Sequence, residues 1–172
     1  VVRAILTDAE ARDDVGNASS GRLKDPIYHA VAFLRALGGS ISPTNVQAWT
    51  FSRMSQTPLS PASVFGFYSP LFRIPRSSLL GPEFQIYGPT EAVLRGNLFW
   101  EILSNPGSDF PIDLAAFVNL AGNTVALIDA VDQALLYGRM PAAMRQSLAN
   151  AINAQGDNRS RALTALYLTS LS

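Results

Sequence analysis

The sequence predicts a mainly α-helical protein: a multi-helix bundle, orthogonal or irregular, with a long ordered loop rich in proline and aromatic residues. Over most of the chain, apolar residues recur three and four positions apart, which is the spacing of one helix face. Typical helix-capping residues stand at the ends of these stretches. No segment shows the alternation of apolar and polar residues that a half-buried strand needs.

The composition narrows the class of protein. The 172 residues fit a single helical domain, residues 1–172, and 48% apolar against 15% charged residues excludes a disordered tail. Thirteen basic residues balance thirteen acidic ones, so no net charge attracts nucleic acid. The absence of cysteine excludes disulfides, thiolate metal sites and cysteine nucleophiles. No apolar run reaches the ~18–20 residues of a membrane span. We therefore expect no nucleic-acid partner and no transmembrane segment.

The first helical region extends from residue 1 to about residue 53. Val2, Ile5 and Leu6 form a short apolar stripe, and the turn-forming residues 13–21 predict an exposed loop after it. Both ends of the chain read as parts of apolar helices. We therefore expect the chain to be the C-terminal fragment of a longer protein.

The next helix has clear start and stop signals. Asp25 is suited to be its N-cap and Pro26 its first residue, while Gly38 and Gly39 predict its end in a left-handed turn. Its inward face is expected to contain Ile27, Val31, Leu34 and Leu37. A further helix is expected to begin at Ser42 or Thr44 and to carry Val46 and Trp49.

Residues 56–89 differ from the rest in composition. Prolines at 58, 61, 70, 75, 82 and 89 forbid a long helix and disfavour a central strand. The aromatic content is too high for a solvated linker. We therefore expect a long ordered loop whose rings are buried and whose backbone is hydrogen-bonded locally, and loops of this length often serve a function. The aromatic residues concerned are Phe65, Phe67, Tyr68, Phe72, Phe84 and Tyr87.

Helices return from Thr90 to the end. The first is expected to end at Asn105, the second to be capped near Asp113, and the third to span 124–136. Tyr137 and Gly138 predict a break. Two more helices are expected to begin at Pro141 and after Asp157.

The candidate site residues are few. His29 is the only histidine, so metal sites built from several histidines are excluded; a hydrogen-bonded structural histidine is favoured over a general base. Arg73 and Arg76 can clamp an anion, but capping of helix carbonyls is favoured. Asp129 and Asp132 are interpreted as a solvent-facing pair. We expect no metal and no cofactor.

Several segments of the chain resemble one bacterial family. Residues 59–70 (LSPASVFGFYSP) and 80–86 (LGPEFQI) resemble the C-terminal part of the family catalogued as domain of unknown function 1800. The segment 4–12, the helix start at Lys24, Asp25 and Pro26, and the residues 136–140 agree with the same pattern, as do Arg161 to Leu163 and Tyr167 to Leu168. The resemblance covers nearly the whole chain in the same order.

The resemblance indicates where the protein is located, but it does not indicate what reaction the protein catalyses. Members are longer and often exported, which implies a periplasmic, cell-surface or secreted location. They are often encoded beside an exported sulfatase-like protein, which implies such a protein as a partner. The family has no established activity or catalytic residues, so the resemblance assigns none to this chain.

Three functions remain open. The first is a non-catalytic helical module whose loop 56–89 packs on the N-terminal remainder of its own chain or on a partner. The second is one half of an envelope hydrolase, with its site between two halves and contributions from His29, Arg73, Glu83 or Gln85. The third is a peptide- or glycan-binding surface made of Phe67, Tyr68, Phe72 and Tyr87.

Overall fold

The computed structural model describes residues 1–9, 23–40, 51–106 and 109–172. The expected loop 13–21 and the expected helix from Ser42 or Thr44 lie outside these residues. The helices are, in chain order, α1 (Val2–Thr7), α3 (Pro26–Ala36), α5 (Pro89–Ser104), α6 (Ala115–Leu120), α7 (Thr124–Val131), α8 (Ala142–Asn153) and α9 (Asn158–Ser170). A short 3₁₀ helix, η1 (Pro82–Ile86), precedes α5, and a π-helical turn, η2 (Asp132–Leu136), follows α7. The prediction of a mainly α-helical fold is confirmed.

The helix starts follow from local hydrogen bonds. Asp25 accepts the backbone N–H of Tyr28 at 2.9 Å, and Asp157 accepts that of Ser160 at 3.0 Å, so both predicted caps are confirmed. Gly38, with φ 63°, ends α3 in the expected left-handed turn. Tyr137 also has a left-handed φ of 57° and forms the break predicted after residue 136.

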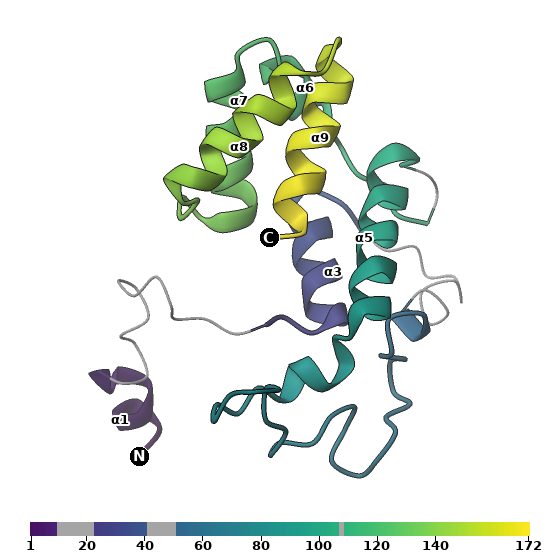
Figure 1. Ribbon diagram of the computed structural model, residues 1–172, viewed down its shortest axis with the longest axis vertical. Coiled ribbons are helices and arrows are strands. Elements are labelled where there is room, and N and C mark those ends of the chain that lie inside the picture. Colours follow the sequence, from purple (N-terminus) through teal and green to yellow (C-terminus); the bar gives the residue numbers. More distant parts are fainter. Residues whose placement is uncertain (10–22, 41–50, 107–108) are drawn as a thin grey trace.

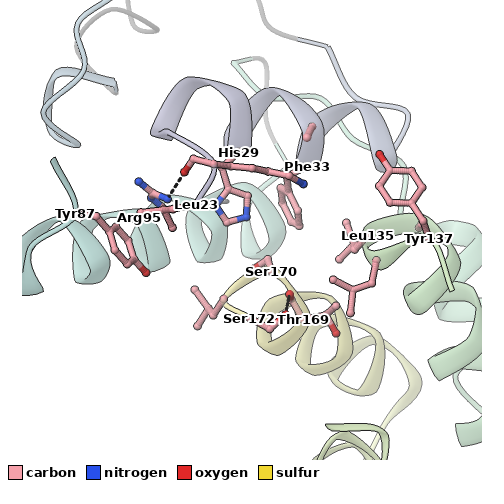
Figure 2. A pocket seen from close by; sticks show the side chains of 15 residues that line it. Leu23, His29, Phe33, Tyr87, Arg95, Leu135, Tyr137, Thr169, Ser170 and Ser172 are labelled. Carbon is pink, nitrogen blue, oxygen red and sulfur yellow. Dashed lines mark hydrogen bonds between the residues drawn. The ribbon is translucent and has the colours of Figure 1, made fainter. Parts of the chain in front are cut away.

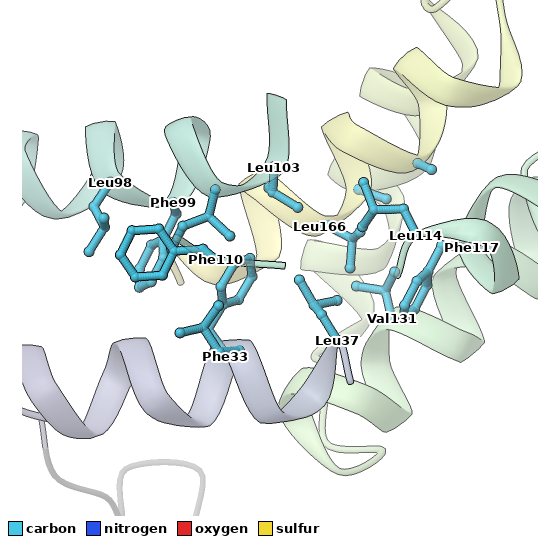
Figure 3. Close-up of a cluster of buried hydrophobic side chains, with 14 of the residues drawn as sticks. Phe33, Leu37, Leu98, Phe99, Leu103, Phe110, Leu114, Phe117, Val131 and Leu166 are labelled. Carbon is cyan, nitrogen blue, oxygen red and sulfur yellow. The ribbon is translucent and has the colours of Figure 1, made fainter. Parts of the chain in front are cut away.

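Helix α9 is the centre of the helical packing. It contacts α5, α6, α7 and α8, and α3 lies beside α5 and contacts η2 (Figure 1). The core runs from the space between α3 and α5 into the space between α6, α7 and α9 (Figure 3). Its side chains include Phe33, Leu37, Phe99, Leu103, Phe110, Phe117, Val131 and Leu166.

The acidic pair on α7 and η2 is not a simple solvent-facing pair. Asp132 is only 2% exposed, and it accepts hydrogen bonds from the backbone of Met140 at 2.9 Å and from Arg145 Nη2 at 2.6 Å. Arg145 Nη1 donates to Asp129 at 2.6 Å. The interpretation as solvent-facing was therefore wrong for Asp132, because its partners come from the turn after η2 and from α8.

Segment 56–89 has the locally bonded backbone that its sequence predicts. Ile74 N donates to Leu79 O at 3.1 Å, Gly81 N donates to Phe72 O at 3.0 Å, and an isolated bridge pairs Ser63 with Gly66. These bonds hold the backbone in tight turns without drawing its side chains into the core. The expected burial of the rings is therefore wrong in part: Phe65 is 76% exposed, whereas Phe67, Tyr68 and Phe72 are half-buried.

Two features at the surface complete the fold. All residues of α1 are exposed, so its apolar stripe of Val2, Ile5 and Leu6 has no covering surface among the described residues. In the described part of the chain, every helix is too short or too polar to cross a bilayer.

Candidate functional site

Two basic side chains with little exposure, His29 and Arg95, lie where α3, α5 and the end of α9 meet (Figure 2). The Asp25 cap and Pro26 fix the start of α3, which places His29 one turn further on, facing α5. The His29 ring meets Phe99 of α5 edge-on, with 4.6 Å between the ring centroids. Phe33, one turn beyond His29, also contacts Phe99 at 4.7 Å. His29 is therefore half-buried in an aromatic contact.

Arg95 is the buried cation of this region. It is 3% exposed, because it stands in the helical register of Leu98, Phe99 and Ile102 on the inward face of α5. Its Nη1 donates to the backbone oxygen of Lys24 at 2.9 Å, and its guanidinium lies 4.5 Å from the centre of the Tyr87 ring. Its Nε and Nη2 atoms are buried without a hydrogen-bond partner.

A cavity of about 230 Å³ lies beside these groups. The residues that line it include Lys24, His29, Arg95 and Thr169, and Thr169 Oγ1 is buried without a hydrogen-bond partner. Leu135 from η2 lies at the opposite end of the cavity from Arg95 (Figure 2). The apolar part of the wall consists of Leu23, Ala32, Phe33, Ala134, Leu135, Leu136 and Leu171. None of the described residues that line this cavity is acidic.

Burial determines which of the basic side chains beside the cavity are charged at pH 7. Burial lowers the pKa of His29 from 6.5 to about 4, the charges of Arg95 and Lys24 act in the same direction, and a hydrogen bond with the Ser170 backbone opposes them. His29 is therefore neutral at pH 7. Burial also lowers the pKa of Arg95, while Tyr87 and Asp25 oppose that shift. Because arginine starts from so high a value, its guanidinium keeps its charge.

A second cavity, of about 400 Å³, adjoins the first. Leu23, Lys24, Ala32 and Tyr137 line both cavities. Asp25, Tyr28, Tyr68 and Glu83 complete the wall of the second one. The Tyr68 hydroxyl donates to Asp25 Oδ2 at 3.4 Å, so segment 56–89 contributes to this wall through Tyr68 and Glu83.

The residues that the sequence singled out do not converge on one site. His29 lines the first cavity, and Tyr68 and Glu83 line the second. Phe67 and Phe72 are half-buried in segment 56–89, and neither lines these two cavities. Arg73, Arg76 and Gln85 are exposed.

The exposed polar candidates serve local structure. Arg73 Nη1 donates to the Ser78 carbonyl at 2.8 Å, within segment 56–89, so the expected capping of a helix carbonyl is not found for Arg73. Gln85 accepts the Ser69 N–H at 2.7 Å. Among the described residues, no three histidine, aspartate or glutamate side chains gather in a way that can hold a metal ion.

Sequence reasoning missed Arg95, although a signal was present. Apolar residues stand three, four and seven positions after it, which makes it a cation within a buried helical stripe. Cations are rarely fully buried unless they are paired, so this position alone pointed to a partner or a ligand.

Comparison with known proteins gives one match. No curated protein and no solved structure matches the chain. The family model described as "Protein of unknown function (DUF1800)" matches residues 1–172. The resemblance inferred from segments such as LSPASVFGFYSP therefore holds over the full length given, and the chain belongs to the DUF1800 family.

Proposed function

We propose that the chain is a non-catalytic helical interaction module of an exported bacterial protein, and that its segment 56–89 docks on another protein surface. The proposed docking partner is the N-terminal portion of a longer chain of the same family. The observation that carries the proposal is the exposure of Phe65, Val64 and Leu71 in a segment whose backbone is hydrogen-bonded.

The exposed side chains of this segment are unusually apolar. Val64 is 95% exposed, Phe65 76% and Leu71 74%, and Leu59, Leu79, Leu80 and Phe84 are exposed as well. Single exposed apolar residues are common, but seven within one segment are typical of a surface that a partner covers. In Figure 1 this segment extends from the start of α5, away from α7 and α8.

The backbone of the segment is organised before any partner binds. Gln56 and Ile86 anchor it through buried side chains, and Ser55 donates to Glu91 of α5 at 3.1 Å. Glu91 also accepts the N–H of Gly88 at 3.1 Å, which fixes the exit into α5. A fixed backbone lowers the entropy lost on binding, which favours recognition.

The charges of the segment indicate the kind of surface that it meets. Segment 56–89 contains Arg73, Arg76 and one acidic residue, Glu83; both arginines are exposed, whereas Glu83 is half-buried. The complementary surface is therefore apolar with acidic groups at its rim. Residence in the periplasm, on the cell surface or outside the cell is part of the proposal and rests on the family resemblance.

Co-purification of two separately encoded portions tests the docking. Tagged residues 1–172 are co-expressed with the N-terminal portion of the same protein, as wild type and as Phe65→Ser with Leu71→Ser. Loss of two apolar contacts is expected to weaken binding about tenfold or more. The matched control is Val125→Ser on α7, which is 66% exposed and stands outside the segment.

Each outcome of this experiment decides something. Retained binding by the double variant, or equal loss in the Val125→Ser control, contradicts docking through segment 56–89. Binding to an exported sulfatase-like protein, with none to the N-terminal portion, contradicts the proposal that the N-terminal portion is the docking partner. Thermal unfolding of each variant confirms that it is folded.

A hydrolase half is the second candidate, and one observation favours it. His29, which lines the first cavity, has a strongly lowered pKa, and ionisable groups with perturbed pKa values are typical of functional sites. Replacement of His29 by Gln would then abolish hydrolysis by the full-length protein without loss of docking. The peptide- or glycan-binding surface has less support, since Tyr87 is engaged by Arg95 and Tyr68 by Asp25.

A further inference from the structure

Three tyrosines from separate parts of the chain line the second cavity. They are Tyr28 of α3, Tyr68 of segment 56–89 and Tyr137 from the turn after η2. Tyr28 is 65% exposed and Tyr137 73% exposed, so core packing accounts for neither ring and both are open to a ligand. The volume of about 400 Å³ lies within the roughly 300–1,000 Å³ of pockets for small molecules.

The protein holds each of these tyrosines in place. The Tyr68 hydroxyl donates to Asp25 Oδ2 at 3.4 Å, and the Tyr28 N–H donates to Asp25 Oδ1 at 2.9 Å. Tyr137 has a φ of 57°, a left-handed conformation that favours glycine, and its side chain projects from the turn after η2 towards α3 (Figure 2). Because this conformation is strained for tyrosine, an exposed ring there points to a role outside the core.

The same cavity brings together two opposite charges that do not pair. Lys24 is exposed and Glu83 half-buried, and both line the cavity. The ion pairs among the described residues are those of Arg145, so Lys24 and Glu83 form none with each other. Asp25, the third charged residue of the wall, already accepts hydrogen bonds from within the protein. The wall therefore offers a ligand one ammonium and one carboxylate.

This combination of groups fits a small zwitterion. Tyrosine rings attract organic cations, and rings gathered at one site are a common means of recognising quaternary ammonium groups. A quaternary ammonium has no N–H to donate, so it gains from rings and a carboxylate without needing aligned acceptors. The ammonium of Lys24 supplies a compact positive charge for an anionic group. A wall with one charge of each sign favours a molecule that carries both charges over a simple cation or anion.

We propose that the second cavity binds a small betaine-type zwitterion, with its quaternary ammonium against the tyrosine rings and Glu83 and its carboxylate on Lys24. The proposal goes beyond docking through segment 56–89 and does not rest on it. Phe65 and Leu71, on which the docking experiment depends, do not line this cavity. Binding involves no covalent step.

Calorimetric titration of the full-length protein tests the site with matched probes. Glycine betaine carries both charges, 3,3-dimethylbutanoate has the same shape with carbon in place of the charged nitrogen, and choline lacks the carboxylate. Glycine betaine is expected to bind saturably at one site. The binding of 3,3-dimethylbutanoate is expected to be about tenfold or more weaker, because the attraction to the rings and Glu83 is lost. Choline is expected to bind about threefold or more weakly, since the contact with the exposed Lys24 is lost.

Substitutions at exposed positions separate the groups of the wall without disturbing the core. Tyr137→Leu is expected to weaken the binding of glycine betaine about threefold or more, whereas Tyr137→Phe, which keeps a ring in the same backbone conformation, should leave it nearly unchanged. Lys24→Gln is expected to remove the preference for glycine betaine over choline. The control is Phe65→Ser with Leu71→Ser, which should bind glycine betaine as the wild type does.

The results that overturn the proposal are distinct. Lack of saturable binding of glycine betaine, or equal binding of glycine betaine and 3,3-dimethylbutanoate, overturns the site. Equal effects of Tyr137→Leu and Tyr137→Phe overturn the role of the ring, and equal binding of choline and glycine betaine overturns the assignment to a zwitterion. Saturable binding of methyl glucoside in place of glycine betaine overturns the ligand class. Failure of the docking experiment changes none of these results, so the two proposals fail separately.

Discussion

Gln56 is hydrogen-bonded to Asp25, the N-cap of α3, although 31 residues separate them. Its Nε2 donates to Asp25 Oδ2 at 3.0 Å, and its Oε1 accepts the Ile27 N–H at 2.8 Å. Gln56 is 3% exposed. One buried amide therefore joins the start of segment 56–89 to the start of α3, which couples the shape of the segment to the helical scaffold.

Replacement of Gln56 by Ala is expected to destabilise the protein and loosen the segment. The change leaves the Ile27 N–H without its acceptor and one Asp25 oxygen without a donor, at a cost of about 1–3 kcal/mol. Urea unfolding measures the loss, and hydrogen exchange of the segment's amides measures the loosening. Gln146→Ala on α8, where the side chain is exposed and donates to Asn150 one turn further along the helix, serves as the control and should change neither. Equal effects of the two substitutions would show that Gln56 is not an anchor.

The stability of the protein is expected to fall between pH 7 and pH 5 because of His29. Its pKa is about 4 in the folded protein and 6.5 when exposed, mainly because burial disfavours the charged form. The unfolded chain therefore binds a proton that the folded chain rejects, so stability is full above pH 6.5 and declines as the pH falls toward 4. Over pH 7 to 5 the expected loss is about 2 kcal/mol.

Unfolding of His29→Gln across the same range identifies the source of this pH dependence. The variant should lack most of the slope, since its side chain does not titrate. A slope of the same size in the variant would assign the effect to other groups.

Asp132 and Asp129 both bind Arg145, yet their removal is expected to have unequal effects. Asp132→Ala leaves the buried N–H of Met140 without an acceptor, which costs about 1–3 kcal/mol. Asp129 is more than half exposed and supports only the ion pair, so Asp129→Ala should cost much less. Thermal unfolding of both variants measures the difference. Equal losses would indicate that the ion pair, rather than the Met140 bond, is the stabilising feature.

Most helices could be predicted because their start and stop signals are local. Asp25, Asp157 and Gly38 act on backbone groups within a turn of themselves, so the sequence contains the whole interaction. The π-helical turn η2 was predicted only as a continuation of α7. Its wider winding carries no sequence signal comparable to a cap.

The candidate site could be predicted only in part. His29 was identified by its chemistry, but its position against Phe99 depends on how α3 crosses α5. The partners of Asp132 come from an adjacent turn and a second helix, and the exposure of Phe65 depends on where the core ends. Such relationships arise from tertiary packing, which spacing along the chain does not encode.

The proposal that segment 56–89 docks on the N-terminal portion is tested most directly by measuring how far the segment is protected from a thiol-alkylating reagent. The chain has no cysteine, so Phe65→Cys introduces one thiol at a position that is now 76% exposed, and Ser147→Cys on α8 places another on an exposed helix surface as a control. Alkylation of each introduced thiol is followed by mass spectrometry in residues 1–172 and in the full-length protein. If segment 56–89 docks on the N-terminal portion, the thiol of the Phe65→Cys variant should react rapidly in residues 1–172 and slowly in the full-length protein, while the control reacts equally in both. Equal reactivity of the Phe65→Cys thiol in the two proteins would contradict the account.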